Sequence, residues 1–321
     1  MAVSIAATVL NEVDDISSLV ASLTDQTLIP AEVVIVDGGS TDGTWEWLLK
    51  AKSQYPTLVP IRDESCNLKQ SPGPIARGRN VAIAAATSEV VACADAGCTY
   101  RPDWLSRLTA PIVDGTAEYA VGGSCLDPAS PTVWDIASAP FFGVKLNPTE
   151  PTKSCTARSM AFRKELWQRV GGFPETVFFG EDTLFDAKVR NLVTPAFVDR
   201  AKAFYRPRHA LRSAISQLAS YAIADGALGI RSARLFRNLA RCVAEVLALV
   251  ALRWSAIPLL CILVLENYFA FRLDWRSLQR ASFRVLVARL IFSLLVPWVV
   301  TWNQIKGGIT KAHQANRQNA I

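Results

Sequence analysis

Hydrophobic and polar positions alternate in blocks along the first hundred residues. The chain begins with a β-branched apolar run, Val3–Leu10, which predicts a buried strand. Behind Asp14 and Asp15, apolar residues recur at i, i+3, i+4 and i+7, which predicts a capped helix; they are Ile16, Leu19, Val20 and Leu23. Further strands are predicted at 33–36, 58–61 and 89–94, and helices at 44–50 and 75–86. Strands that alternate with helices predict parallel βαβ units with helices on both faces of the sheet.

Polar side chains follow three of the predicted strands. Asn11, Asp37 and Asp95 each stand within about a residue of a strand's carboxyl end. Because ligands of such sheets bind beyond the carboxyl ends of the strands, these residues predict a shared binding site. Asp37 opens the turn Asp-Gly-Gly-Ser-Thr-Asp-Gly-Thr, whose glycines permit close approach of a ligand to the backbone.

The pattern becomes irregular after a strand predicted at 119–123. A second block then predicts a strand at 159–162 and a helix at 164–170, followed by Gly-Gly-Phe-Pro-Glu at 171–175. Gly180, Glu181 and Asp182 open a helix that is predicted to reach about Leu192, and another helix is predicted at 210–224.

The tail is much more apolar. Cys242–Leu265 is marginally long enough to span a membrane, whereas Leu290–Trp302 is too short unless flanking arginines snorkel. Two spans would place the arginine-containing linker on the side opposite the enzyme, against the positive-inside tendency. Helices in the membrane interface, re-entrant helices, or a helical bundle covered by oligomerisation remain open alternatives.

Composition supports a membrane partner. Of 321 residues, 50% are hydrophobic, the net charge is +6, and the stretch Arg200–Arg241 is rich in arginine. Without a nucleic-acid-binding module, this basic stretch favours anionic lipid over nucleic acid. Seven cysteines, no Cys-x-x-Cys and two histidines argue against a disulfide framework or zinc site, and predict reduced thiols in the cytoplasm. The first residues lack a signal-peptide pattern.

Four segments together resemble the family 2 glycosyltransferases of the GT-A fold. They are Thr-Val-Leu-Asn-Glu at 8–12, the stretch 33–44, the stretch 76–98, and the stretch 161–182 that contains Gly-Gly-Phe-Pro-Glu and Gly-Glu-Asp. The resemblance covers about residues 3–230. It implies an α/β GT-A domain at 1–230, with a Rossmann-like, mainly parallel sheet, and leaves 231–321 as a basic and apolar membrane-associating region of a bacterial type.

The resemblance also implies residues that bind the donor, a nucleoside-diphosphate sugar. Asp37 would bind the base or ribose, with Asn11 and Glu12 beside the nucleotide. Arg79 or Arg77 would neutralise the diphosphate, and Asn80 would lie close by; the donor set predicted here is Asn11, Glu12, Asp37, Arg79, Asn80 and Asp95. The family usually has a second acid after the position of Asp37, where this chain has Gly38. Asp42 is expected to cap a helix or order the turn.

Asp95 stands where the family has an Asp-x-Asp motif that holds Mg²⁺ or Mn²⁺ against the diphosphate. Here the motif reads Asp95-Ala96-Gly97, so one protein carboxylate would serve as metal ligand. Asp103 is a remote substitute and is expected to cap a helix. Because the second acid of the motif is missing, we expect a weaker dependence on metal. The missing acid also leaves open the alternative that the protein is an inactive nucleotide-binding scaffold.

Asp182 is the predicted general base of an inverting transfer, and Glu181 is its alternate or a ligand of sugar hydroxyls. Arg206, Arg208 and Arg212 are predicted to bind an acceptor or donor phosphate, and a catalytic role for His209 is disfavoured. The Gln-x-x-Arg-Trp motif of processive synthases is absent. The expected acceptor is a lipid-linked saccharide of envelope or exopolysaccharide assembly; the alternative is a polyprenyl phosphate, as in relatives similar to dolichyl-phosphate mannose synthase. The sequence is also compatible with a homo-oligomer.

Overall fold

The computed structural model describes residues 1–127, 131–146, 156–206, 210–230, 232–252, 257, 261 and 282–318. The chain divides into two compact units. A catalytic unit comprises residues 1–129 and 144–206, and a helical unit comprises 130–143 and 207–321. Helix α8 therefore groups with the C-terminal helices, while the predicted boundary after residue 230 stays a prediction.

The catalytic unit contains one eight-stranded sheet within the described residues. The strand order is β3-β2-β1-β4-β7-β6-β8-β5. The strands are β1 (Val3–Val9), β2 (Glu32–Asp37), β3 (Leu58–Arg62), β4 (Val90–Cys93), β5 (Cys98–Tyr100), β6 (Tyr119–Leu126), β7 (Met160–Arg163) and β8 (Ala196–Tyr205). The first four strands pair in parallel, and β7 pairs antiparallel with both β4 and β6. The N-terminal half matches the predicted βαβ units, and the other half is mixed.

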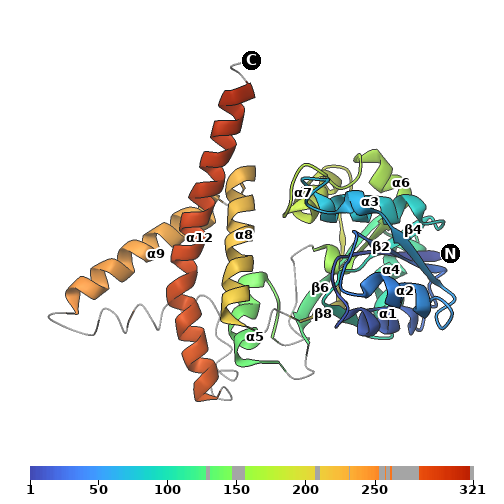
Figure 1. The fold of residues 1–321 in the computed structure, drawn as a ribbon, viewed down its shortest axis with the longest axis horizontal. Coiled ribbons are helices and arrows are strands. Elements are labelled where there is room, and N and C mark those ends of the chain that lie inside the picture. Colours follow the sequence, from blue (N-terminus) through green and yellow to red (C-terminus); the bar gives the residue numbers. More distant parts are fainter. Residues whose placement is uncertain are drawn as a thin grey trace. The chain divides into compact units, whose positions relative to one another are not determined.

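Helices cover both faces of this sheet (Figure 1). One face carries α3 (Pro74–Ala85), α6 (Lys164–Arg169) and α7 (Glu181–Arg190), and the other carries α1 (Ile16–Thr24), α2 (Thr44–Ala51) and α4 (Trp104–Val113). Helix α1 buries Ile16, Leu19, Val20 and Leu23, the four residues of the predicted apolar stripe. Each helix thus lies on the sheet through the face that its sequence period defines.

The mixed half contains elements that hydrophobic periodicity did not indicate. Strand β5 has only three residues, and β8 exposes Asp199 and Arg200 while its end at Ala203–Tyr205 pairs with β5. Helix α4 begins after Asp103, whose carboxylate accepts a hydrogen bond from Arg107 at 2.7 Å rather than from the helix backbone. Short strands with charged residues carry little period-2 signal, because only part of each is buried.

The helical unit contains α5 (Val133–Ser138), α8 (Leu211–Leu228), α9 (Ser232–Ala251) and α12 (Phe283–Gln318). Helices α8 and α12 cross at their glycines. A Cβ at Gly226 would lie 1.9 Å from the carbonyl oxygen of Gln304, and one at Gly307 would lie 2.0 Å from that of Ile223. Only glycine allows the two backbones to approach this closely.

This crossing predicts that Gly226→Val destabilises the helical unit by about 3 kcal/mol, because the added side chain overlaps backbone atoms that cannot rotate away. Urea unfolding in mild detergent measures the effect. Gly308→Ala is the matched control in the same interface, since its Cβ would meet the Gly226 carbonyl oxygen at an ordinary 3.8 Å. Equal stability of the two variants would contradict the close crossing.

Helix α12 extends well beyond the apolar stretch expected to be too short. Among the described residues, Phe283–Thr310 forms a segment of 28 residues that is long and apolar enough to cross a membrane, with half of its most apolar window buried inside the structure. It incorporates Arg284 and Arg289. Of the other predicted span, Cys242–Leu265, only residues up to 252 and two isolated positions lie in the described parts of the chain.

Candidate active site

The turns after β1 and β2 are joined by hydrogen bonds. Asn11 has a positive φ of 56°, and its Oδ1 accepts a hydrogen bond from the Thr41 backbone N–H at 2.9 Å. The Glu12 N–H donates to the Thr44 hydroxyl at 2.9 Å, and Asp42 accepts from Thr44 and from the Val13 N–H. These bonds hold Asn11 and Glu12 beside the glycine-rich turn, and Asp42 orders that turn as expected.

Asp37 ends β2 and is completely buried. Its Oδ1 accepts hydrogen bonds from the backbone N–H groups of Gly39 and Ser40 at 2.8 and 2.9 Å. Its Oδ2 is buried without a hydrogen-bond partner in the structure. A buried unsatisfied carboxylate oxygen is costly, so this atom has capacity for one further hydrogen-bond donor. The next residue is Gly38, where the family has its second acid. A Cβ at this position would lie 2.5 Å from the Cys66 carbonyl oxygen, so the structure has no room for an acidic side chain there.

Arg79 joins the carboxylates predicted at distant points of the sequence. Its side chain is 3% exposed; Nη2 donates to Asp95 Oδ1 at 2.5 Å, and Nη1 donates to Glu181 Oε1. The charge of Asp182 also interacts with Arg79. We call Arg79, Asp95, Glu181 and Asp182 the Arg79 cluster. The structure thus brings three carboxylates together around one buried cation. They are Asp95, the predicted metal ligand, Asp182, the predicted general base, and Glu181, its alternate.

Glu181 and Asp182 occupy the first turn of α7, after Gly180 in the left-handed region. Asp182 is partly exposed; its Oδ1 accepts from the Thr183 N–H at 2.7 Å and its Oδ2 from the Ala157 N–H at 3.4 Å. Glu181 is buried. Burial, opposed by the charge of Arg79 and aided by that of Asp182, raises the pKa of Glu181 to about 7.

This raised pKa predicts a dependence of stability on pH. Between about pH 4.5 and 7, Glu181 holds a proton in the folded chain and releases it in the unfolded chain. The contribution of this proton to the unfolding free energy is therefore complete below pH 4.5 and is lost as the pH rises through 7. The unfolding free energy of the parent relative to Glu181→Gln should fall by on the order of 3 kcal/mol across this window. Urea titrations test this. Glu118→Gln, which removes an exposed partner of Arg169, should show no such slope.

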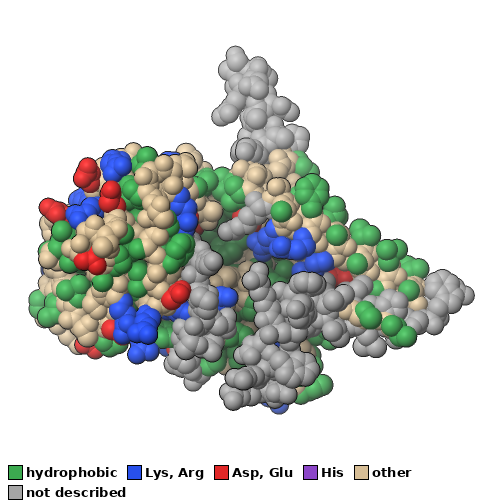
Figure 2. All heavy atoms as spheres, turned by 180° about the vertical axis from the view of Figure 1, so that it is seen from behind, with side chains coloured by type: hydrophobic (Ala, Val, Ile, Leu, Met, Phe, Trp, Pro, Cys, Tyr) green, Lys and Arg blue, Asp and Glu red, His purple; other side chains and the backbone are tan. Residues whose placement is uncertain are grey.

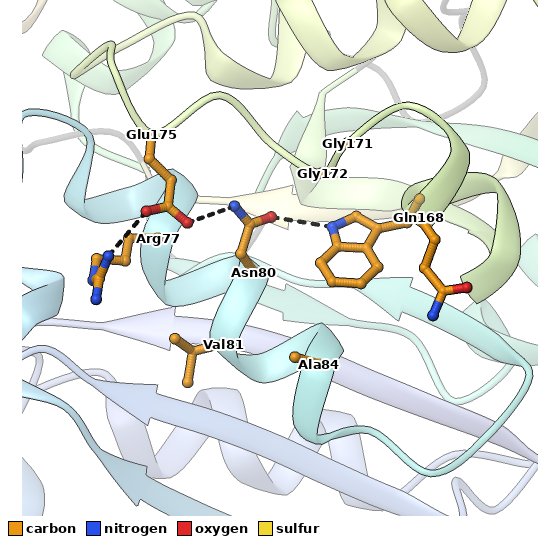
Figure 3. A pocket seen from close by; sticks show the side chains of 9 residues that line it. Arg77, Asn80, Val81, Ala84, Gln168, Gly171, Gly172 and Glu175 are labelled. Carbon is orange, nitrogen blue, oxygen red and sulfur yellow. Dashed lines mark hydrogen bonds and ion pairs between the residues drawn. The ribbon is translucent and has the colours of Figure 1, made fainter.

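Asn80 and Glu175 join α3 to the Gly-Gly-Phe-Pro-Glu loop (Figure 3). The Asn80 amide donates to the Phe173 carbonyl oxygen and to Glu175, and its Oδ1 accepts from the Phe173 N–H and from Trp167. All four hydrogen-bonding positions of Asn80 are thereby used within the protein. Arg77 pairs with Glu175 at 3.1 Å beside a pocket of about 520 Å³. Contact of Asn80 with a nucleotide stays a prediction; the structure gives it these other partners.

The predicted phosphate-binding arginines lie where the catalytic unit ends and the helical unit begins. Arg206 pairs with Asp127 at 2.9 Å and Asp15 at 3.3 Å, and its N–H donates to the Gly97 carbonyl oxygen. Arg206 therefore ties the end of β8 to the turn that follows Asp95. Arg212 is exposed in the first turn of α8, and Arg208 lies outside the described residues, as does His209.

Tyr100 supports Asp95 and was not singled out from the sequence. Its hydroxyl accepts a hydrogen bond from the Asp95 N–H at 3.0 Å and donates to the Arg158 carbonyl oxygen at 3.0 Å. Glu175 was missed in the same way, although it lies inside a quoted motif. Glu175 contacts Arg77 and Asn80, which lie far away in sequence, and no local spacing signals such a contact. Tyr100 is only five residues after Asp95, but its place depends on the short strand β5, which the pattern did not predict.

The described residues contain no group of three or more His, Cys, Asp or Glu side chains placed to hold a metal ion. The Asp95 side chain is nevertheless 23% exposed, with one oxygen paired to Arg79. One accessible carboxylate suits a hard divalent cation whose remaining ligands are diphosphate oxygens and water. The site therefore fits a cation that binds together with the donor.

The N-terminal half of the chain, which includes Asp37, Arg79 and Asp95, matches a known family. The family described as Glycosyl transferase family 2 matches residues 4–171, more than half of the chain. The chain belongs to glycosyltransferase family 2. It is therefore a glycosyltransferase, and the predicted membership of this family is confirmed. The Gly-Glu-Asp motif at 180–182 lies beyond the matched residues.

Relatives agree with this assignment. The glycosyltransferase AglE of Haloferax volcanii is 33% identical over 125 residues, which cover 38% of each chain. A mannosyltransferase, PcManGT of Pyrobaculum calidifontis in complex with GDP-Man and Mn2+, has a similar structure with a TM-score of 0.60 at 20% identity, over 91% of this chain and 86% of the other. The structure of S. aureus TarS 1-349 in complex with UDP is also similar, with a TM-score of 0.50 at 18% identity. The match covers 99% of this chain and 92% of the other. These structures confirm the GT-A fold of this glycosyltransferase.

Proposed function

We propose that this glycosyltransferase transfers a sugar from a nucleoside-diphosphate sugar with inversion at the anomeric carbon. The Arg79 cluster carries the proposal. It brings a strand-end carboxylate, Asp95, and a helix-start carboxylate, Asp182, to one buried guanidinium. Such an arrangement suits a reaction in which one group steadies a leaving diphosphate and another receives a proton.

The donor half of the proposal rests on the turns after β1 and β2. Asp37 has a buried oxygen without a partner, which would accept from a base N–H or a ribose hydroxyl. Asn11 and Glu12 border the same turn. Solved relatives are bound to GDP-Man with Mn2+ or to UDP, which supports a nucleotide-sugar donor. When bound at Asp95, Mg²⁺ or Mn²⁺ would offset the charge that grows on the leaving diphosphate.

Proton removal is assigned to Asp182. It is partly exposed, whereas Glu181 is buried and paired with Arg79, so only Asp182 is open to an acceptor hydroxyl. Backbone N–H groups of Ala157 and Thr183 orient its carboxylate. Arg79 holds Asp95 and Glu181 in place and would face the diphosphate once the donor is bound.

The acceptor proposal rests on the helical unit. An apolar helix long enough to cross a membrane and the basic residues before it favour association with a membrane, with the catalytic unit on the cytoplasmic side. We propose a lipid-linked saccharide as acceptor, with Arg206, Arg208 and Arg212 as candidate phosphate ligands, in envelope or exopolysaccharide assembly. A homo-oligomer is compatible with this arrangement.

A thermal-shift panel of UDP-, GDP- and dTDP-sugars with Mg²⁺ or Mn²⁺ tests the donor. A ligand that binds only the folded state at a hundred times its Kd should stabilise it by about 2.7 kcal/mol. Asp37→Asn should reduce the shift and Asp114→Asn should not, because Asp114 is exposed after α4 and its carboxylate accepts hydrogen bonds from Thr116. If no nucleotide sugar shifts the transition, the proposed donor class is wrong.

Thin-layer analysis of radiolabelled products tests the acceptor. With a polyprenyl-diphosphate-linked sugar as acceptor, we expect a longer lipid-linked saccharide. The alternative, transfer to polyprenyl phosphate, predicts a labelled product from polyprenyl phosphate alone. A product only from the second lipid would replace the proposed acceptor with the alternative and leave the assignment of the donor unchanged.

A further inference from the structure

Helix α9 has its polar side inside the helical unit and its apolar side outside. Asn238 and Glu245 lie on the buried side together with the small residues Cys242 and Ala248, at a spacing of three to four residues and only 2 to 4% exposed. On the opposite side, Phe236 is 70% exposed and Leu247 is 63% exposed. A surface helix of a protein in water shows the reverse order, with its apolar stripe toward the core.

The buried polar side of α9 is hydrogen-bonded to α12. Trp298 Nε1 donates to Glu245 Oε2 at 2.5 Å, and Arg241 donates to the Ser293 carbonyl oxygen at 3.3 Å. These contacts place polar groups of α9 against a neighbouring helix instead of water. Polar side chains that bond across helices, under an apolar exterior, are characteristic of helices in contact with lipid.

The exposed apolar side forms a continuous strip along α9. Its members recur at helical spacing and are each between 44 and 70% exposed: Phe236, Leu239, Val243, Val246, Leu247 and Val250. Hydrophobic side chains line the described surface of this helix in Figure 2. A strip of this length exceeds the scattered apolar residues normal on a soluble surface, so it marks an interaction site.

Two neighbouring features identify the partner as lipid. Helix α12 packs on α9 and contains the segment long enough to cross a membrane, and it exposes Trp302 by 70% and Ile309 by 53%. The first half of α9 carries Arg234, Arg237 and Arg241 and no acidic residue, which complements anionic headgroups.

We propose that the Phe236–Val250 strip of α9 contacts the acyl chains of an anionic membrane, while its polar side stays sealed against α12. This inference deepens the membrane association proposed above and does not depend on the donor or the acceptor. It assigns α9 to the membrane interface, with the arginines of its first half at the headgroups.

Site-directed fluorescence tests the proposal on the full-length chain. Leu247→Cys in a Cys261→Ser background is labelled with an environment-sensitive probe and bound to vesicles of phosphatidylcholine and phosphatidylglycerol. Leu49→Cys is the matched control, because Leu49 is 51% exposed on α2 of the catalytic unit. The Cys261→Ser parent, carried through the same labelling, gives the blank. Val243→Cys repeats the measurement on the same strip in case Leu247→Cys fails to fold.

At position 247, we expect iodide quenching several-fold weaker than at position 49, and quenching by doxyl-labelled lipid several-fold stronger. Equal iodide quenching at both positions would place the strip in water and overturn the proposal. Protection of position 247 from both quenchers would show that protein, such as a second copy of the chain, covers the strip, and would also overturn it. Loss of glycosyl transfer in the assays above leaves these readouts unchanged.

Discussion

Replacement of Asp182 by asparagine is expected to reduce transfer about a thousandfold while leaving donor binding intact. The amide keeps the shape of the side chain but cannot take a proton, and general-base catalysis typically contributes factors of 10² to 10⁴. Asp182 is the partly exposed member of the Arg79 cluster, and its loss leaves the Arg79 bonds to Asp95 and Glu181 in place. Initial rates with the donor and acceptor selected above, together with donor titration calorimetry, measure the two effects separately.

Asp186→Asn is the matched control for this measurement. Asp186 lies one turn later on α7 and accepts hydrogen bonds from Tyr119 at 2.9 Å and Arg190 at 2.7 Å, away from the Arg79 cluster. It should keep a rate within a few-fold of the parent. If Asp182→Asn retains activity while Glu181→Gln loses it, the two carboxylates have exchanged roles and Glu181 is the base.

Arg79→Gln is expected to cost about 3 to 5 kcal/mol of stability at pH 8. The substitution leaves Asp95 and Glu181 without their shared cation, and breaking a buried ion pair exposes an uncompensated charge to a medium that solvates it poorly. Urea unfolding measures the loss. Because the same guanidinium would face the donor diphosphate, the variant should also lose the nucleotide-sugar thermal shift.

Arg77→Gln provides the comparison two residues away on the same helix. Arg77 is 40% exposed and pairs with Glu175, which is 37% exposed, so its removal should cost no more than about 1 kcal/mol. A double variant, Arg79→Gln with Glu181→Gln, should recover part of the loss because one unpaired buried acid is gone. Equal losses for Arg77→Gln and Arg79→Gln would show that Arg79 is not the centre of the cluster.

The contrast between these arginines shows what sequence patterns reveal about the site. The motifs identified Asp37, Asp95 and Asp182 as candidates, because each follows a strand or opens a helix. They left open whether Arg77 or Arg79 acts at the site. Residues two apart point to nearly opposite sides of a helix, so one must be buried when the other is exposed. Which side faces the sheet depends on the packing of α3, and the structure buries Arg79.

The fold was predictable where the hydrophobic periodicity of a segment and its length indicate the same type of element. The N-terminal strands and helices appear within about two residues of their predicted ends, since most of these strands are short, largely buried apolar runs. Strand β8 and the three-residue β5 were missed because their pairing is decided by distant strands. Periodicity along α9 likewise identifies two sides of a helix but not which one faces a partner.

The glycine crossing of α8 and α12 has a practical consequence for cutting the chain. A fragment that ends near residue 230 keeps Gly226 but loses Gln304, the backbone on which it rests. Helix α8 would then present a notch shaped for a missing neighbour, and such a fragment should associate with itself or precipitate. A cut soon after Arg206 would remove α8 as well, but it would keep residues 130–143, which belong to the helical unit and pack against α8 and α12. The enzyme is therefore better crystallised with its helical unit intact.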